Sequence, residues 1–400
     1  MAITFILHEA TRTGAPRLGG QIARELARDE DVRVVVMRDG PLTPWLRQLL
    51  GAQNVLVCRG DPFHFRVPFD ERVQRAAEML EGDPADLVYA NSLATSVFVF
   101  AAAQRKRRTI LHVHEKIAEI VNLLAHDATK IEVMRIADAV VLAAQDIGDD
   151  LIEVFGTAPS LNETFGVAVD LDAIRQAALS AAPSPLNARG AALEKGERMI
   201  VAMSGQASAR KGVDIFFQCA VALPQCDFLW IGGWRPEETA DNIAFEDFNA
   251  RKLPNFYVSG PVDNPYPYMQ LMDLFFLCSR EDPNPLVLAE TLALQRPLMC
   301  FSQTTAVADR LGRCGIVCYG PPNVADAARV IGACSVERLR SPDFRSLGDA
   351  YLADCDLNQK MAMLRDLIAR VRGEAPAVRF GTQGAAPRVL ESGVVELNFS

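Results

Sequence analysis

The chain has 400 residues, of which half are apolar and 23% are charged, and its formal net charge is −9. At roughly 100–200 residues per domain, this length predicts two folded domains. The composition excludes a disordered or collagen-like chain. Nucleic acid is a poor partner because no basic excess is available to neutralise phosphates. The nine cysteines lie mostly in apolar surroundings, which indicates buried, reduced thiols in a cytoplasmic protein.

The first half of the chain alternates short β-branched runs with helical stretches. Helices are predicted to begin near residues 16, 44, 70, 93 and 116. Alternation of this kind favours a parallel sheet covered by helices on both faces, so residues 1–170 are expected to form a Rossmann-like, doubly wound α/β domain. The predicted strands are residues 3–7, 32–37, 54–58, 87–90, 109–114 and 139–143.

An apolar stretch at residues 87–103 precedes four basic residues. It contains polar residues and is short for a bilayer, so it predicts a buried strand followed by a packed helix. Cations at the carboxyl end of that helix complement its dipole. They also leave open a peripheral contact with an anionic membrane surface at the inner face. The four residues are Arg105, Lys106, Arg107 and Arg108.

The pattern breaks at residues 171–198, where small and turn-forming residues predict a linker. Residues 199–355 then repeat the α/β alternation, with helices predicted near residues 211, 267, 286, 305 and 324. A helix at 356–372 and a loose tail at 373–400 are expected to follow. Two such domains facing each other create a cleft at the carboxyl ends of their strands. The strands predicted here are 199–203, 228–231, 256–258, 274–278, 298–301 and 316–319.

Two strand-to-helix loops are candidates for anion binding in that cleft. Gly14 lies at a helix start, but its loop lacks the glycine pattern of dinucleotide-binding proteins. Arg210 and Lys211 precede a helix in the second half, where cations oppose the helix dipole. A bound polyanion explains two cations at this position. The alternative is a pair of solvated charges.

The segment 279–290 carries the strongest functional signal. A polar loop containing Asp282 follows a buried strand, and a helix is predicted to begin near Leu286. The backbone N–H groups of Leu286 and Val287 suit a phosphate. The carboxylates of Asp282 and Glu290 suit hydroxyl-rich groups such as ribose and sugar. The alternative is that Asp282 caps the helix and Glu290 is a solvated charge.

The chain resembles the family-4 glycosyltransferases, which are retaining enzymes of the GT-B fold. The family signature Ser-x-x-Glu-x-Phe-Gly-Leu-Val-x-x-Glu corresponds to residues 279–290, with Asp282 at the first Glu position and Glu290 at the second. The resemblance covers about residues 3–372. It implies two Rossmann-like domains facing across a cleft, and transfer of a sugar from a nucleotide-sugar donor to a hydroxyl of a glycan or lipid-linked acceptor. Further matches lie at residues 13–16, 112–115, 210–214, 256–262 and 267–273.

The resemblance also implies the catalytic residues. Lys211 is expected to contact the diphosphate, Asp282 to hold the donor sugar, and His114 to approach the sugar from the N-terminal domain. Gln206 occupies a position where the family usually has an arginine. No metal or other cofactor is expected, because this fold neutralises the leaving diphosphate with cations and helix dipoles.

The remaining expected site residues bind the donor. Glu290 is expected to hold the ribose hydroxyls, and the loop around residues 260–262 is expected to face the base. Two other interpretations remain open: a nicotinamide-dependent dehydrogenase, and a non-catalytic subunit that binds a nucleotide sugar or a partner protein. The donor-binding residues implied by the resemblance are Gly14, Arg210, Lys211, Gly260, Val262, Asn284, Pro285, Leu286, Val287 and Glu290.

Overall fold

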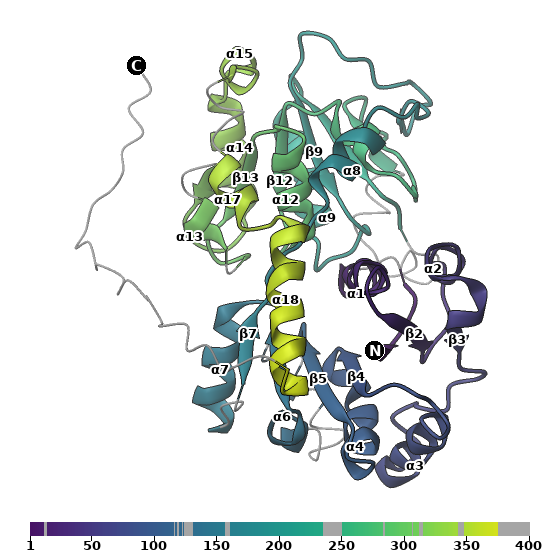
Figure 1. Ribbon diagram of the computed structural model, residues 1–400. Helices are drawn as coiled ribbons and strands as arrows, with labels where there is room; N and C mark the ends of the chain where they lie inside the picture. Colours follow the sequence, from purple (N-terminus) through teal and green to yellow (C-terminus); the bar gives the residue numbers. More distant parts are fainter. Residues whose placement is uncertain are drawn as a thin grey trace.

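The computed structural model shows two α/β domains, one above the other in Figure 1, with helix α18 (Leu357–Arg372) running along both. Each domain contains one seven-stranded sheet. The structure describes residues 1–11, 14–115, 117, 120, 121, 123, 131–156, 161–234, 250–282, 285–305, 307–311, 315–342 and 348–374.

The N-terminal sheet has the strand order β3-β2-β1-β4-β5-β6-β7, and every pair of neighbours is parallel. Its central strands are apolar runs because helices cover both faces. The strands are β1 (Ala2–Leu7), β2 (Asp31–Val36), β3 (Val55–Val57), β4 (Leu87–Asn91), β5 (Arg108–Val113), β6 (Ala139–Leu142) and β7 (Asn162–Thr164). The helices are α1 (Gly14–Leu26), α2 (Thr43–Leu50), α3 (Phe69–Met79), α4 (Ser96–Gln104), α6 (Val133–Ile136) and α7 (Gln145–Phe155), with short 3-10 turns η1 (Ala52–Asn54) and η2 (Leu93–Thr95).

The C-terminal sheet has the order β14-β13-β12-β9-β10-β11-β8, and only β8 is antiparallel to its neighbour. Its chain order reverses between β9 and β12, which is the place where open α/β sheets bind ligands. The strands are β8 (Leu186–Asn187), β9 (Ile200–Ser204), β10 (Asp227–Ile231), β11 (Phe256–Val258), β12 (Leu274–Leu277), β13 (Leu298–Phe301) and β14 (Ile316–Cys318). The helices are α8 (Leu171–Ala177), α9 (Val213–Ala222), α11 (Tyr266–Met269), α12 (Leu286–Ala293), α13 (Ala308–Leu311), α14 (Val324–Ala333), α15 (Val336–Leu339) and α17 (Asp349–Ala353).

Helix α18 follows the C-terminal domain in sequence but packs on the N-terminal one. Its apolar face joins a core cluster with β1 and α1, and includes Met361, Leu364 and Leu367. At its end, Arg372 is 4% exposed and donates to Glu30 and Asp86 at 2.6 Å each. The chain therefore crosses between the domains twice, which ties them together at one side of the molecule.

The predicted doubly wound fold is confirmed, and each predicted strand agrees with the observed one within one residue at both ends. The segment predicted as a linker at 171–198 contains α8 and β8, and the sequence pattern did not indicate β7. The helix expected near residue 116 falls largely outside the described residues, as does the tail beyond residue 374.

The apolar stretch at 87–103 forms β4, η2 and α4, as predicted. Of the basic residues that follow, Arg107 donates to the carbonyl oxygens of Leu80 and Asp83, and Arg108 pairs with Asp138. Along the described part of the chain, every helix is too short or too polar to span a bilayer.

Candidate active site

The first wall of the candidate site is formed by the loops after β9 and β12, which lie against each other. Gly212 permits this approach: its φ is +74°, and a Cβ atom on it would lie 2.1 Å from the carbonyl oxygen of Cys278. The amide of Arg280 donates to the carbonyl of Arg210 at 2.8 Å. The two loops therefore form one continuous surface at the switch point of the sheet.

Arginine side chains reinforce this surface. Arg280 donates to both carboxylate oxygens of Asp214, at 2.8 and 2.6 Å. Burial opposes ionisation of Asp214, but the hydrogen bonds from Arg280 outweigh it and lower the pKa of the carboxyl group. Arg210 is exposed and donates to the carbonyl oxygen of Glu281 at 3.0 Å. Arg280 and Asp214 were not singled out from the sequence as a pair, because Arg280 lies in the loop after β12 and Asp214 lies in the first turn of α9.

Lys211 and Asp282 form an ion pair at the centre of this wall, with side chains 17% and 11% exposed. Ser279 Oγ lies 3.4 Å from the same Asp282 oxygen, and the Asp282 amide donates to the carbonyl of Thr304 at 2.9 Å. Asp282 does not cap the following helix, since the N-cap position of α12 is Pro285. The capping alternative is therefore wrong, and the carboxylate instead faces a lysine that could also bind a phosphate.

Glu290 lies about one turn into α12 and is only 7% exposed, so it is not a solvated charge. Its Oε1 atom accepts a hydrogen bond from the hydroxyl of Tyr266 at 2.9 Å. Burial, together with the Glu290 carboxylate, raises the pKa of Tyr266. From the N-terminal domain, Arg17 Nη2 reaches the same hydroxyl at 3.5 Å. Neither Tyr266 nor Arg17 was identified from the sequence.

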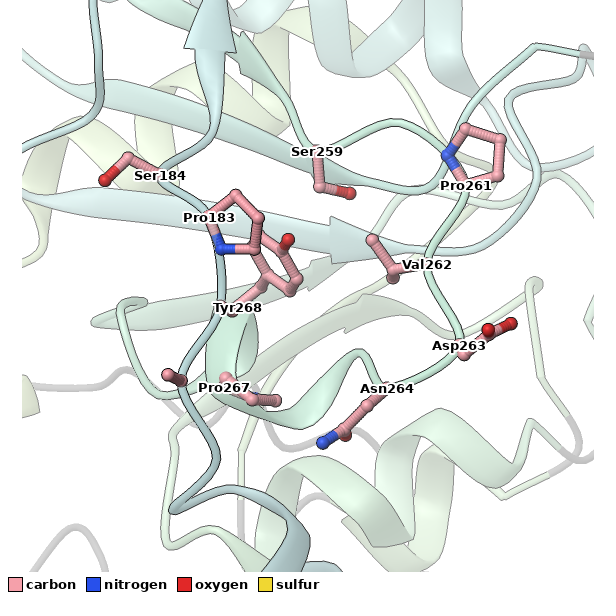
Figure 2. Close-up of a pocket in the computed structure, with 11 residues that line it drawn as sticks. Pro183, Ser184, Ser259, Pro261, Val262, Asp263, Asn264, Pro267 and Tyr268 are labelled. Atoms are coloured by element: carbon pink, nitrogen blue, oxygen red, sulfur yellow. The ribbon is translucent and has the colours of Figure 1, made fainter.

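The loop after β11 contains Gly260 and Val262 and borders a cavity of about 370 Å³ (Figure 2). The positive φ of Gly260, +72°, allows the chain to turn there. The cavity lies between this loop, Tyr268 of α11 and residues 181–184 (Figure 2). Pro261 packs close to Gly233, where an added Cβ would meet the proline ring at 2.8 Å. The loop expected to face the base is thus held beside the loops that follow β9 and β10.

The opposite wall belongs to the N-terminal domain, at the carboxyl ends of β4 and β5. His114 Nε2 lies 3.0 Å from Asn91 Oδ1, and Asn91 Nδ2 donates to the Ala15 carbonyl at 3.2 Å. Burial lowers the pKa of His114 to about 4, although Glu115 acts in the opposite direction. His114 is therefore neutral near pH 7. With Nε2 donating to Asn91, its Nδ1 atom is an acceptor for a hydroxyl group.

Glu115 fixes the chain that follows His114. Its buried carboxylate accepts from the amide of His114 at 3.0 Å, from the amide of Leu93 at 3.0 Å and from the Ser92 hydroxyl. His112 stacks on His114 with ring centroids 3.9 Å apart, and burial lowers the pKa of His112 well below its usual value. These contacts hold His114 in one orientation at the edge of the sheet.

The two walls come together at the beginnings of α1 and α12. A Cβ atom on Gly14 would lie 3.7 Å from Leu286 Cδ1, so two residues predicted to bind the donor from opposite domains are neighbours. Pro285 is buried beside them, and Val287 is half-buried in the first turn of α12. Asn284, the remaining predicted residue, lies outside the described residues. The described ranges contain no cluster of three or more histidine, cysteine or acidic side chains able to hold a metal ion.

Most of the C-terminal domain is similar to a known protein family. Residues 197–334, which hold the first wall, match the family described as glycosyl transferases group 1. About a third of the chain, most of its C-terminal domain, is thus similar to the group 1 glycosyltransferases. This similarity favours the glycosyltransferase prediction over the dehydrogenase alternative.

One curated glycosyltransferase resembles part of the chain. It is the alpha-galactosylglucosyldiacylglycerol synthase of Streptococcus pneumoniae, which is 29% identical over 105 residues. That match spans 26% of this chain and 28% of the length of the synthase.

Solved structures share the GT-B fold over nearly the whole chain. Anabaena HepE in complex with UDP superposes with a TM-score of 0.73 at 17% identity, covering 92% of this chain and 100% of HepE. The lipopolysaccharide glycosyltransferase WaaG superposes with a TM-score of 0.65 at 16% identity, covering 92% of this chain and 99% of WaaG. These superpositions show that the chain has the GT-B fold.

Proposed function

We propose that the protein is a retaining glycosyltransferase that moves a hexose from a UDP-sugar to a hydroxyl group of a glycan or glycolipid. The observation that carries the proposal is the Lys211–Asp282 ion pair, set at the switch point of a group 1 glycosyltransferase domain. The choice of uracil as the base is supported by HepE, which was solved with UDP and with UDP-glucose. The glycolipid acceptor is supported by the Streptococcus relative.

Each side chain of the site has a role in this reaction. Lys211 turns from Asp282 to the departing diphosphate, and Asp282 then accepts hydrogen bonds from the donor sugar. Glu290 accepts from the ribose hydroxyls. His114, being neutral, accepts from a sugar hydroxyl through Nδ1. The exposed guanidinium of Arg210 adds positive charge near the diphosphate.

The chemical step is a front-face displacement. The bond from the anomeric carbon to the diphosphate oxygen breaks with its electron pair on the diphosphate. The acceptor oxygen forms its bond on the same face, and its proton passes to the departing phosphate oxygen. The protein positions the two substrates and stabilises the negative charge on the leaving group.

Charge stabilisation by Lys211 and the beginning of α12 makes a metal ion unnecessary in this proposal. Turnover should therefore persist after prolonged treatment with EDTA and removal of the chelator. Complete loss of turnover, restored by Mg²⁺ or Mn²⁺, would contradict a metal-free mechanism.

The decisive experiment measures UDP release with a panel of UDP-sugars and glycan or glycolipid acceptors, and determines the anomeric configuration of the product by NMR. We expect acceptor-dependent UDP release and a product with the configuration of the donor. UDP binding without turnover on any acceptor would favour the non-catalytic subunit. We also propose that the enzyme works on cell-surface polysaccharide or glycolipid assembly at the inner face of the membrane, where the exposed residues Arg105, Lys106 and Arg108 supply positive charge.

A further inference from the structure

Helix α1 brings a cation from the N-terminal domain to the ribose-binding carboxylate proposed above. Arg17 Nη2 lies 3.5 Å from the Tyr266 hydroxyl, which lies 2.9 Å from Glu290 Oε1. The Glu290 charge and Tyr266 raise the pKa of Arg17, although burial of the guanidinium acts against them. Three side chains from α1, α11 and α12 thus form one polar chain across the interface between the domains.

The chemistry of the three groups fixes the direction of the hydrogen bonds. A guanidinium can only donate and a carboxylate can only accept. The Tyr266 hydroxyl therefore accepts from Arg17 and donates its single proton to Glu290. In the described part of the chain, only Tyr266 donates to Glu290, so Oε2 is available for a ribose hydroxyl. Tyr266 consequently orients the carboxylate and does not block it.

Tyr266 is fixed within the C-terminal domain. Its amide donates to Asn264 Oδ1 at 3.2 Å, and Asn264 Nδ2 donates to the Ala177 carbonyl of α8 at 2.8 Å. Proline residues on both sides of Tyr266 restrict its backbone further. Within the series Arg17, Tyr266 and Glu290, the contact between Arg17 and Tyr266 is therefore the one that joins the two domains. This contact exists only when the domains are close together.

Burial of the Glu290 charge requires compensation. A carboxylate that is 7% exposed is costly unless it is hydrogen-bonded and near a positive charge. The compensating cation in this arrangement belongs to the opposite domain. We propose that Arg17 is a positioning residue that couples closure of the two domains to ribose binding, acting on Glu290 through the Tyr266 hydroxyl. This inference rests on the proposed function, in which Glu290 binds the ribose.

Coupling of this kind predicts that a residue of the N-terminal domain affects binding of a nucleotide held mainly by the C-terminal domain. Calorimetry with UDP as the probe compares the wild type, Arg17→Gln, Tyr266→Phe and the double variant. We expect UDP to bind about tenfold more weakly to each single variant, a typical size for such coupling. The double variant should bind no more weakly than the single ones, since both substitutions interrupt the same series of hydrogen bonds from Arg17 to Glu290.

The control is Arg24→Gln, which removes an arginine on the same helix whose side chain is 42% exposed and which contacts Glu25. This variant should bind UDP as the wild type does.

For Arg17→Gln, KM for the UDP-sugar should rise about tenfold while kcat changes much less. Arg17→Lys keeps the charge and should recover part of the affinity. Small-angle scattering should show compaction on adding UDP to the wild type, and less of it in Arg17→Gln.

Wild-type affinity for UDP in the Arg17→Gln variant would overturn the inference and leave the proposed function intact. Fully additive losses in the double variant would likewise overturn it, because Arg17 would then act independently of Tyr266. If the wild type itself failed to bind UDP or any other nucleoside diphosphate, the proposed function and this inference would both be wrong. Tyr266→Phe keeps the test decisive if Arg17→Gln does not fold.

Discussion

The Lys211 ammonium group is placed between two anions: the Asp282 carboxylate that it contacts and, in the proposed reaction, the donor diphosphate. Replacing Lys211 by Met keeps the length of the side chain but removes its charge. We expect kcat to fall by about 10²–10³-fold, the effect of losing one donor to a transition-state anion. Steady-state kinetics with a saturating UDP-sugar measures the change.

The matched control is Lys195→Met, because Lys195 lies in the same domain and donates to the carbonyl of Gln270 at 3.3 Å, away from the proposed donor site. This variant should retain turnover. Equal kcat values for Lys211→Met and the wild type would remove Lys211 from the site.

Glu290 is the residue that we expect to control nucleotide affinity. Glu290→Gln keeps the shape and one acceptor oxygen but loses charge-assisted hydrogen bonds, each worth about 1.5–3 kcal/mol. UDP should therefore bind about ten to a hundred times more weakly, while turnover at saturating donor should change less. Calorimetry with UDP tests the first part, and the exposed neighbour Glu281 supplies the control variant Glu281→Gln.

A Glu290→Gln enzyme that bound UDP normally but did not turn over would instead assign Glu290 to the chemistry.

The same carboxylate also shows what a sequence can indicate about a site. The spacing of Asp282 and Glu290 was visible in one segment. By contrast, the contact between Arg17 and Tyr266 joins residues 249 positions apart, and it depends on how two domains dock. Local patterns carry no information on such docking.

At the scale of elements, the predicted strands were accurate because parallel strands covered by helices are continuous apolar runs. The two strands that were not predicted lie at sheet edges and are short: β7 has three residues and β8 has two. Their sequences, Asn-Glu-Thr and Leu-Asn, have neither an apolar run nor a clear alternation. Pairing with a neighbouring strand, which the sequence does not display, determines their conformation.

The contact between the loops after β9 and β12 depends on Gly212. Gly212→Ala would force a side chain into a left-handed backbone, at a cost of about 1–3 kcal/mol, and would place its Cβ 2.1 Å from the Cys278 carbonyl oxygen. Gly190→Ala is the control, since Gly190 has φ +80° but no atom within 4 Å of an added Cβ. We expect chemical denaturation to show a larger loss of stability for Gly212→Ala.

The Gly212→Ala variant should also lose activity, because separating the two loops moves Lys211 away from Asp282. Equal losses of stability for the two alanine variants would mean that the loops can move apart without cost. In that case the close approach would not be what holds the ion pair together.

At the scale of the whole molecule, the two domains differ in their histidines. All five histidines of the chain occur in the first 126 residues, and none occurs in the C-terminal domain. His112 is buried and His114 is half-buried in the N-terminal domain, and desolvation holds the pKa of each below the usual value of 6.5. The domains should therefore respond differently to mild acid, although α18 joins them mechanically.

The expected direction follows from proton binding. Between pH 6.5 and about 4, His114 is protonated in the unfolded chain but neutral in the folded one. The unfolded state then binds more protons, so the free energy of unfolding falls as the pH is lowered. The slope is up to about 1.4 kcal/mol per pH unit for each such histidine. Carboxyl groups with lowered pKa values, such as Glu9 at about 2, lose their stabilising effect only at lower pH.

Urea denaturation at several pH values between about 7 and 5 measures this slope, and hydrogen exchange identifies the domain that opens. We expect exchange to increase first in the strands of the N-terminal sheet. In the wild type, the Tyr89 hydroxyl lies 2.9 Å from His112 Nδ1. The side-chain amide oxygen in His112→Gln can still accept a hydrogen bond from this hydroxyl, and the variant should reduce the slope. His64→Gln, at a half-buried histidine in the loop between β3 and α3, should not reduce it. An unchanged slope in His112→Gln, or first opening in the C-terminal sheet, would show that the buried histidines do not determine acid stability.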